Sequence, residues 1–177
     1  MGEVRALVVL ENGDDRGLAR RGVIEPDKIR RVETDLLVDT GAVLVRLPQD
    51  MVEALGLGAM DKAVVTLAND EKVEMSIAGP LVLTALGRTM NTDCLVGPPR
   101  CEPLLGQVVL ERLDLIVDPT RRRLTVRPES PFLPSLKAKS AARGARRRPA
   151  SRRRDDRETT PPGQTVNGKV SVQREDA

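Results

Sequence analysis

The stretch "LLVDTGAVLVRLP", residues 36–48, indicates the fold of this chain more strongly than any other part of the sequence. Apolar residues lead up to Asp39, stop at Thr40 and Gly41, and then resume. This pattern predicts a strand on each side of a tight polar loop. The loop is either an ordinary turn or a catalytic loop. Because a chain of this length has on the order of a 4% chance of containing Asp-Thr-Gly, the tripeptide needs support from its context.

The composition restricts the chemistry that is open to the chain. Its 177 residues suffice for one domain with a core and an extra segment. Phe132 is the only aromatic residue, so we expect a core of aliphatic side chains. The absence of histidine excludes Ser-His-Asp and Cys-His catalysis and His-ligated metal sites. Acid–base chemistry near neutral pH therefore has to use carboxylates, lysines or a shifted cysteine, and we expect no cofactor or metal.

Charge divides the chain into two regions. Residues 1–136 carry a net charge of −4, whereas residues 137–177 carry +7 and have almost no apolar content. Such a tail cannot bury enough surface to offset the entropy of ordering, so we expect it to be disordered. Several prolines stand near the boundary. We therefore expect a folded domain over residues 1–130 and a Pro/Arg-rich basic tail over 131–177.

The arginines of the tail invite comparison with nucleic-acid-binding segments. Clustered arginines bind phosphates without sequence preference. No aromatic residue lies between them to stack on bases, which favours a solvated tail. A weak, non-specific nucleic-acid contact through residues 143–157 stays open as an alternative.

Cellular location is suggested by what the sequence lacks. No apolar stretch approaches the roughly 18 residues that span a membrane, and the first residues do not form a secretory signal. Cys94 and Cys101 are too few for a disulfide framework. We expect a cytoplasmic protein with reduced thiols and no membrane partner.

The first half of the domain reads as strands with one clear helix. Residues 4–10 are β-branched and apolar, and residues 31–40 alternate as a half-buried strand does. Residues 41–47 predict a further strand directly after the polar loop. Residues 14–31 are polar and glycine-containing, so they connect elements and have room for one short helix. Residues 48–58 predict a short helix with proline in its first turn.

The second half predicts hairpins. Residues 62–97 contain four short apolar runs, which favour a series of antiparallel hairpins. Residues 104–106 close a strand before a short helix over residues 107–113. We expect turns at residues 68–71, Gly79-Pro80, Gly87-Arg88 and Asp118-Pro119-Thr120. The whole pattern predicts a mainly β domain, a small closed or sandwich-like barrel with one or two short helices.

Taken in order, these signals resemble the retroviral-type (retropepsin-like) aspartic proteases and their small single-domain bacterial relatives. The matching stretches are residues 36–48, residues 95–119 and the hairpin around residues 68–70, and the resemblance covers roughly residues 4–130. It implies a small closed retropepsin-like β-barrel with one lobe per chain. The expected flap lacks the glycines that retroviral enzymes have there, and the connector over residues 12–31 is longer than theirs.

The resemblance also implies roles for individual residues. Asp39 would be the catalytic aspartate. Thr40 would brace two active-site loops against each other, and Gly41 with Ala42 would complete the loop beneath the substrate. Leu104, Leu105 and Gly106 would form the structural loop under Asp39, and Ala68, Asn69 and Asp70 would form the tip of the flap.

One carboxylate is not enough for this chemistry. Two aspartates held within hydrogen-bond range share a proton, so that one acts as a base on water and the other as an acid toward the scissile carbonyl. The sequence has one Asp-Thr-Gly and no second Asp-Ser/Thr-Gly. We therefore expect an aspartic endopeptidase that is active as a symmetric homodimer, with Asp39 from each chain and a peptide or protein as substrate.

Two other functions remain as alternatives. A catalytically inactive dimeric module of the same fold could bind a peptide or protein, and a nucleic-acid-associated protein could act through the basic tail. The intact Asp39 favours the peptidase over the binding module, which would not need a carboxylate there. Arg46, which follows the motif, either pairs with a carboxylate or lies on the surface.

Overall fold

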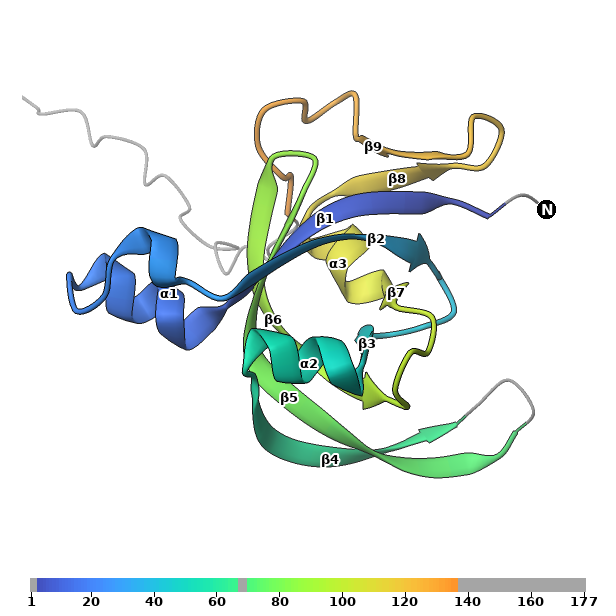
Figure 1. Cartoon of the computed structure of the whole chain (residues 1–177). Helices are drawn as coiled ribbons and strands as arrows, with labels where there is room; N and C mark the ends of the chain where they lie inside the picture. Colours follow the sequence, from blue (N-terminus) through green and yellow to red (C-terminus); the bar gives the residue numbers. More distant parts are fainter. Residues whose placement is uncertain (1–2, 67–69, 137–177) are drawn as a thin grey trace, which may run out of the picture. The chain divides into compact units, whose positions relative to one another are not determined.

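A computed structural model describes residues 3–66 and 70–136 (Figure 1). The chain divides into two units, residues 1–138 and 139–177, and all described residues belong to the first. The elements of this described part, in chain order, are β1 (Arg5–Asn12), α1 (Gly13–Arg20), the 3-10 helix η1 (Pro26–Lys28), β2 (Arg31–Val38), β3 (Val45–Pro48), α2 (Gln49–Leu55), β4 (Gly58–Thr66), β5 (Lys72–Ala85), β6 (Arg88–Gly97), β7 (Leu104–Leu105), α3 (Gln107–Arg112), β8 (Leu115–Asp118) and β9 (Arg123–Val126). The predicted mainly β class is confirmed.

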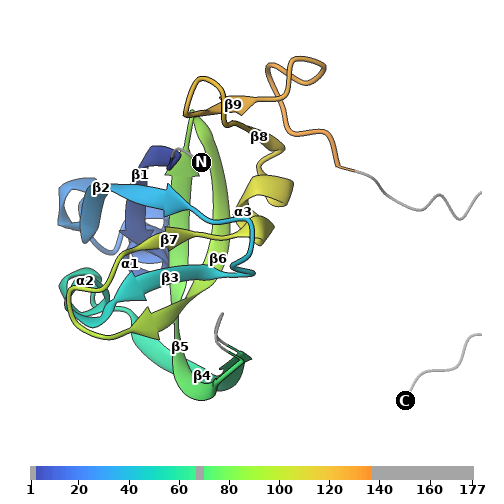
Figure 2. The ribbon, with the colours of Figure 1, turned by 90° about the vertical axis from the view of Figure 1, so that its right-hand side faces the viewer.

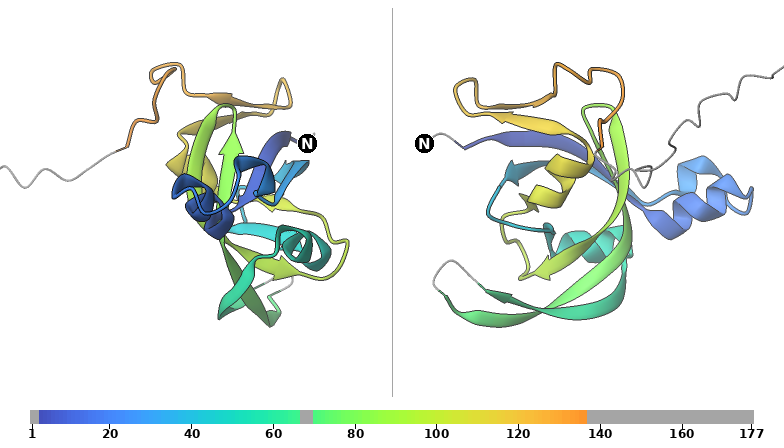
Figure 3. Two further views of the ribbon diagram at one scale, coloured as in Figure 1. Left: turned by 60° about the vertical axis from the view of Figure 1, so that its left-hand side comes forward. Right: turned by 180° about the vertical axis from the view of Figure 1, so that it is seen from behind.

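The main sheet closes on itself. Its strand order is β1-β2-β7-β3-β6-β5-β4, and β1 also pairs with β5, so that six strands form a ring and β4 extends from β5 (Figure 2). Strands β8 and β9 form a separate antiparallel pair. Figure 3 shows α1 projecting beyond the ring, which is how the long connector between the first two strands is accommodated.

The antiparallel pairing predicted for residues 62–97 is confirmed by β4, β5 and β6, but two other pairs of strands in the ring are parallel. Strand β2 pairs with β7, and β3 pairs with β6. Parallel neighbours need a long connection, which sequence periodicity does not reveal. The β2–β7 pairing sets Leu37 opposite Leu104 and Val38 opposite Leu105, so it brings two distant stretches of sequence together directly beside Asp39.

Two local predictions are wrong. The expected turn at Gly79-Pro80 lies inside the long strand β5, where the register with β6 shifts between Ala78 and Leu81. Proline cannot donate to a ladder, so it is found in bulges such as this one. The expected strand over residues 41–47 begins only at Val45. Residues 41–44 form a loop instead, because the carbonyls of Ala42 and Val43 accept hydrogen bonds from the N-terminus of α3.

The core inside the ring is aliphatic, as the composition predicted. Phe132 takes no part in it, since that side chain is 91% exposed. The largest fully buried apolar side chains are Leu10, Leu36, Leu47, Leu55, Leu81, Leu83, Leu105, Leu113, Val8, Val45 and Val109. Asn12 is a buried polar exception: it caps α1 by accepting from the Asp15 N–H and donates to the carbonyls of Leu55 and Gly56.

A buried ionic cluster fastens the segment that follows β9. The Asp114 carboxylate accepts from Ser130 Oγ, from Arg127 Nε at 2.7 Å and from the Ser135 N–H at 3.1 Å. These hydrogen bonds, the one from Ser130 foremost, lower the pKa of Asp114 to about 2. Arg88, also buried, donates to the carbonyl oxygens of Leu113, Asp114 and Ser130. The chain after the last hairpin is thereby held against the body of the domain.

Some predictions concern parts of the chain that the structure does not describe. The basic stretch at residues 143–157 lies outside the described residues, as do Ala68 and Asn69. In residues 3–66 and 70–136 no helix has the length and apolar character needed to cross a membrane.

Candidate active site

Asp39 lies at the first position after β2, in a loop whose backbone is tightly fixed. Its N–H donates to the Leu105 carbonyl at 3.1 Å, and its own carbonyl accepts from the Ala42 N–H at 3.2 Å. The Oδ1 atom of its carboxylate accepts from the Gly41 N–H at 2.9 Å. This bond fixes the orientation of the carboxylate, and Asp39 itself is only half-buried.

Thr40 and Gly41 form the exposed tip of this loop. Both residues are exposed in the single chain, whereas Ala42 is half-buried. A Cβ atom added at Gly41 would lie 3.2 Å from Asp39 Oδ1. Glycine at this position therefore leaves room for the carboxylate to turn back over the loop. The neighbouring Val43 is 63% exposed, an apolar side chain beside a polar motif.

Leu104, Leu105 and Gly106 lie directly against the Asp39 loop. Leu104 and Leu105 form β7, between β2 and β3, and both side chains are buried. Gly106 is buried as well, and its φ of −84° is ordinary, so space is what requires glycine here. A Cβ atom would lie 2.7 Å from the Val43 carbonyl oxygen and still closer to that of Leu44.

Helix α3 completes the contact between the two loops. The Gln107 N–H donates to the Ala42 carbonyl at 2.7 Å, and the Val108 N–H donates to the Val43 carbonyl at 3.1 Å. Helix N-termini have backbone N–H groups without intrahelical partners, and the loop after Asp39 supplies acceptors for two of them. The structure thus brings the Asp-Thr-Gly-Ala and Leu-Leu-Gly stretches into one interlocked unit.

The β4–β5 hairpin is the element in which the sequence predicted a flap. Its last paired residues are Thr66 and Lys72, so the connection spans residues 67–71. Of the three predicted flap residues only Asp70 is described: it is exposed and has a φ of 61°. Figure 1 shows the end of β4 and the start of β5 on the same side of the ring as the loop between β2 and β3.

A cavity of about 490 Å³ lies between this hairpin and the ring. One wall is the β5 arm of the hairpin, and the other is formed by the ends of β3 and β6 with the start of α2. Its lining residues are Arg46, Gln49, Val73, Glu74, Met75, Ser76, Val96, Gly97 and Pro98. This cavity was not predicted from the sequence. The alternation Val45-Arg46-Leu47 does indicate that Arg46 points away from the core face of the strand, and so toward a surface or cavity.

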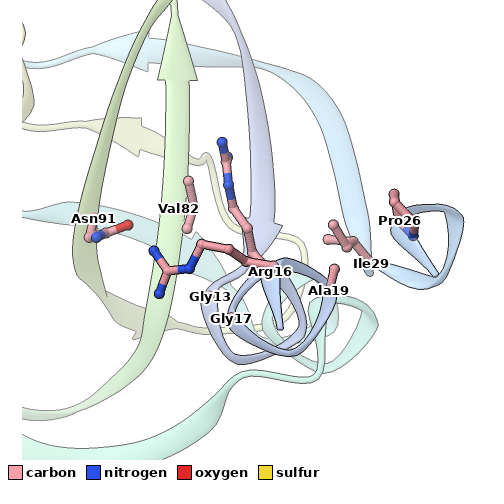
Figure 4. A pocket seen from close by; sticks show the side chains of 9 residues that line it. Gly13, Arg16, Gly17, Ala19, Pro26, Ile29, Val82 and Asn91 are labelled. Atoms are coloured by element: carbon pink, nitrogen blue, oxygen red, sulfur yellow. The ribbon is translucent and has the colours of Figure 1, made fainter. Parts of the chain in front are cut away.

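A second cavity, of about 480 Å³, is remote from the predicted site residues in the fold. Its walls come from α1, from the turn that contains Pro26 and Ile29, and from strands β5 and β6 (Figure 4). None of the residues that the sequence singled out around Asp39, Leu104 or Asp70 lines it. Among the described residues, no cluster of three or more Cys, Asp or Glu side chains is arranged to hold a metal ion.

Comparison with known proteins gives a limited result. No family model matches the chain, and no curated protein sequence matches it. Solved structures do match. One of them is EIAV protease complexed with the inhibitor HBY-793, which is 18% identical in sequence and aligns over 62% of this chain and 86% of that chain with a TM-score of 0.44.

Proposed function

We propose that this chain is an aspartic endopeptidase of the retropepsin-like type that acts as a symmetric homodimer. The observation that carries the proposal is the interlocked unit around Asp39. A half-buried carboxylate is held by the Gly41 N–H on a loop that the Leu105 carbonyl and the start of α3 fix from below. An ordinary surface turn does not need such support from a distant part of the chain.

The exposed tip of the loop supports dimerisation. Thr40, Gly41 and Val43 are exposed next to a loop with a rigid backbone, so a second copy could cover them without rearrangement of the first. Related by a twofold axis, two such loops would place the two Asp39 carboxylates opposite each other. The Thr40 hydroxyl would then be available to hydrogen-bond across the axis. Each chain would supply half of one active site.

The reaction that follows is hydrolysis of a peptide bond. In the dimer the two carboxylates would share one proton, because two negative charges at hydrogen-bond distance repel each other strongly. The ionised Asp39 would take a proton from water while the water oxygen adds to the scissile carbonyl carbon. The protonated Asp39 of the other chain would donate its proton to the carbonyl oxygen, giving a tetrahedral diol. The Asp39 that took the proton from water would then donate it to the nitrogen, while the ionised Asp39 of the other chain takes a proton from one hydroxyl of the diol. The C–N bond breaks, an acid and an amine are released, and the pair again shares one proton.

The β4–β5 hairpin would act as the flap that covers an extended peptide. Support comes from the end of β4 and the start of β5, which lie on the same side of the ring as the loop between β2 and β3, and from the cavity beneath the β5 arm. A cytoplasmic location for the enzyme stays a prediction of the sequence.

The direct test is the Asp39→Asn variant. Asparagine preserves the size of the side chain but cannot take a proton from water, so we expect cleavage of a peptide library to fall by at least about a thousandfold. The urea midpoint of the variant should stay close to that of the unaltered chain, since Asp39 is half-buried and forms no ion pair in the described part. Unchanged cleavage by a folded Asp39→Asn chain would rule out the proposed mechanism and leave the binding module as the better explanation.

A further inference from the structure

We infer that Arg46 makes the cavity beneath the β5 arm a subsite for an acidic side chain, so that the preferred substrate is a peptide with Asp or Glu at one position near the cleaved bond. This inference rests on the proposed peptidase function, because it assigns a specificity to the same cleft. It concerns a residue that the Asp39 machinery does not use.

The direction of the Arg46 side chain follows from the strand. Val45 and Leu47, its neighbours on β3, are both fully buried in the core. Because side chains alternate along a strand, Arg46 projects from the opposite face, toward the cavity. Its stem passes over Gly97, where an added Cβ would lie 3.4 Å from Arg46 Cδ, an ordinary van der Waals contact. The close neighbour at that position is Cys101, whose Sγ atom would lie 2.5 Å from the added Cβ.

The guanidinium of Arg46 leaves hydrogen-bond donors without acceptors in the described part of the chain. Its Nε atom is buried and has no hydrogen-bond partner among the described residues. One NH2 group donates to the Glu102 carbonyl at 3.3 Å, a long bond to a neutral acceptor. A guanidinium has five N–H donors in a planar fork suited to a carboxylate, and burying one without a partner is unfavourable. The side chain is therefore poised for an acceptor that the chain itself does not supply.

The neighbouring carboxylates already have other partners. Glu102 pairs with Arg5 at 2.5 Å, and Glu74 on the cavity wall pairs with Lys62 at 2.7 Å. No carboxylate of the described residues lies within 4 Å of the Arg46 nitrogens. Among residues 3–66 and 70–136, Arg46 is also the only cationic one that lines the cavity. An incoming carboxylate would meet one charge of opposite sign that no group in the described chain neutralises.

The rest of the cavity suits a side chain with an apolar stem and a charged end. Val73, Met75 and Val96 supply apolar walls, and Ser76 supplies a hydroxyl. A volume of about 490 Å³ lies within the roughly 300–1,000 Å³ of typical ligand pockets. A carboxylate between these walls would be partly shielded from water, which strengthens its attraction to Arg46 compared with the open surface. Asp and Glu fit this description, whereas Lys and Arg would be repelled.

The test uses pairs of pools of extended peptides. The two pools of a pair are identical except that one carries Glu and the other Gln at a single fixed position, and this position differs from pair to pair. For the unaltered chain we expect kcat/KM to be about 10- to 100-fold higher with Glu at one position, the range for a hydrogen bond between charged groups. In Arg46→Gln and Arg46→Met that ratio should fall close to one. Either neutral variant suffices, provided that it still unfolds cooperatively in urea.

Arg100→Gln is the matched control. Arg100 is exposed, lies outside the cavity lining and keeps its backbone bond to Asp50, so this variant removes one positive charge near the cleft without altering the proposed subsite. Its Glu-to-Gln ratio should equal that of the unaltered chain. A ratio near one in the unaltered chain, or a ratio that persists in both Arg46 variants, would overturn the inference.

A binding measurement separates this inference from the proposed function. The Asp39→Asn chain, which should not cleave, is mixed with the same fluorescein-labelled pools, and binding is followed by fluorescence anisotropy. Preferential binding of the Glu pool that disappears in Asp39→Asn/Arg46→Gln supports the subsite even if the unaltered chain cleaves no peptide. Cleavage without any preference for Glu supports the peptidase and rejects the subsite.

Discussion

At the scale of single residues, two glycines determine how the candidate site is built. Gly41 gives the Asp39 carboxylate room to accept the N–H of its own loop. Gly106 lets the chain after β7 pass directly beneath the carbonyls of Val43 and Leu44. Neither glycine has a positive φ, so both are needed for close approach of atoms and not for a special backbone conformation. An Asp-Thr-Gly motif in the sequence predicts the first contact but says nothing of the second.

Gly106→Ala should damage both stability and activity. The added Cβ would press on two backbone carbonyl oxygens, which cannot move as a flexible side chain can. We expect a loss of about 1–3 kcal/mol in the free energy of unfolding, measured by urea denaturation, together with weaker peptide cleavage. Gly17→Ala in α1 is the matched control, since nothing lies within 4 Å of its Cβ position; it should be neutral or stabilising by up to about 1 kcal/mol. Equal effects of the two substitutions would contradict the close-packing argument.

At the scale of elements, polar side chains near the ends of strands and helices join the peripheral segments to the ring by hydrogen bonds. Asn12 links the start of α1 to the carbonyls at the end of α2, and Asp15 holds Arg30 through two side-chain hydrogen bonds. These contacts tie the projecting connector to the ring at both of its ends. Asp114 does the same for the segment after β9. Each of these contacts uses a polar side chain with specific partners, and those of Asp15 and Asp114 also depend on the ionisation of a carboxylate.

The stability of the Asp114 cluster should depend on pH in a defined direction. Folding lowers the pKa of Asp114 to about 2, below an unfolded value of about 3.9, so the ionised carboxylate stabilises the fold above that unfolded value. This contribution is lost as the pH falls from about 4 through about 2. Asp114→Asn should therefore lower the urea midpoint at pH 7, and the difference from the unaltered chain should shrink at pH 2.

Asparagine suits this comparison because it tolerates the φ of 52° at position 114 and changes the charge with little change in shape. Asp27→Asn, at an exposed residue whose ion pair with Lys28 is also exposed, serves as the control and should change little at either pH. A midpoint difference for Asp114→Asn that stays constant between pH 7 and pH 2 would show that the charge of Asp114 does not stabilise the fold.

At the scale of the whole molecule, the proposed activity requires two copies of the chain. A single chain contains one Asp-Thr-Gly loop, and that loop has an exposed tip. Dimerisation would bury the tip and complete the site in the same step. Specific activity should therefore rise with protein concentration until the dimer is fully formed, as sedimentation velocity can follow in parallel.

Mixing experiments test the shared site directly. If chains pair at random, adding an equal amount of Asp39→Asn chain to a fixed amount of unaltered chain leaves about half of the original activity, because mixed dimers carry one competent aspartate. A threefold excess leaves about a quarter. An inert protein at the same concentration provides the control. Activity that is unaffected by the Asp39→Asn chain under conditions of free exchange would mean that one chain is sufficient.

The local features of this protein can be predicted from its amino-acid sequence alone. Periodicity gave the strand before Asp39, the helix after Pro48, the helix after Gly106 and the final hairpin, because these depend on neighbouring residues. It also predicted an aliphatic core, since the composition offers almost nothing else. Where it failed, at residues 41–44 and at Gly79-Pro80, contacts with distant segments override local preference.

Which side chains and backbone groups from distant parts of the chain come into contact depends on the tertiary structure. Three features join residues far apart in the chain. They are the parallel pairing of β2 with β7, the clash that forbids a side chain at position 106, and Arg46 opposite the β5 arm, whose Nε atom has no hydrogen-bond partner among the described residues. Hydrogen-bond partners and van der Waals space depend on distances in three dimensions, which hydrophobic periodicity does not encode. The sequence therefore singled out Asp39 as the candidate catalytic residue, whereas the fold supplied the support beneath it and the cavity near it.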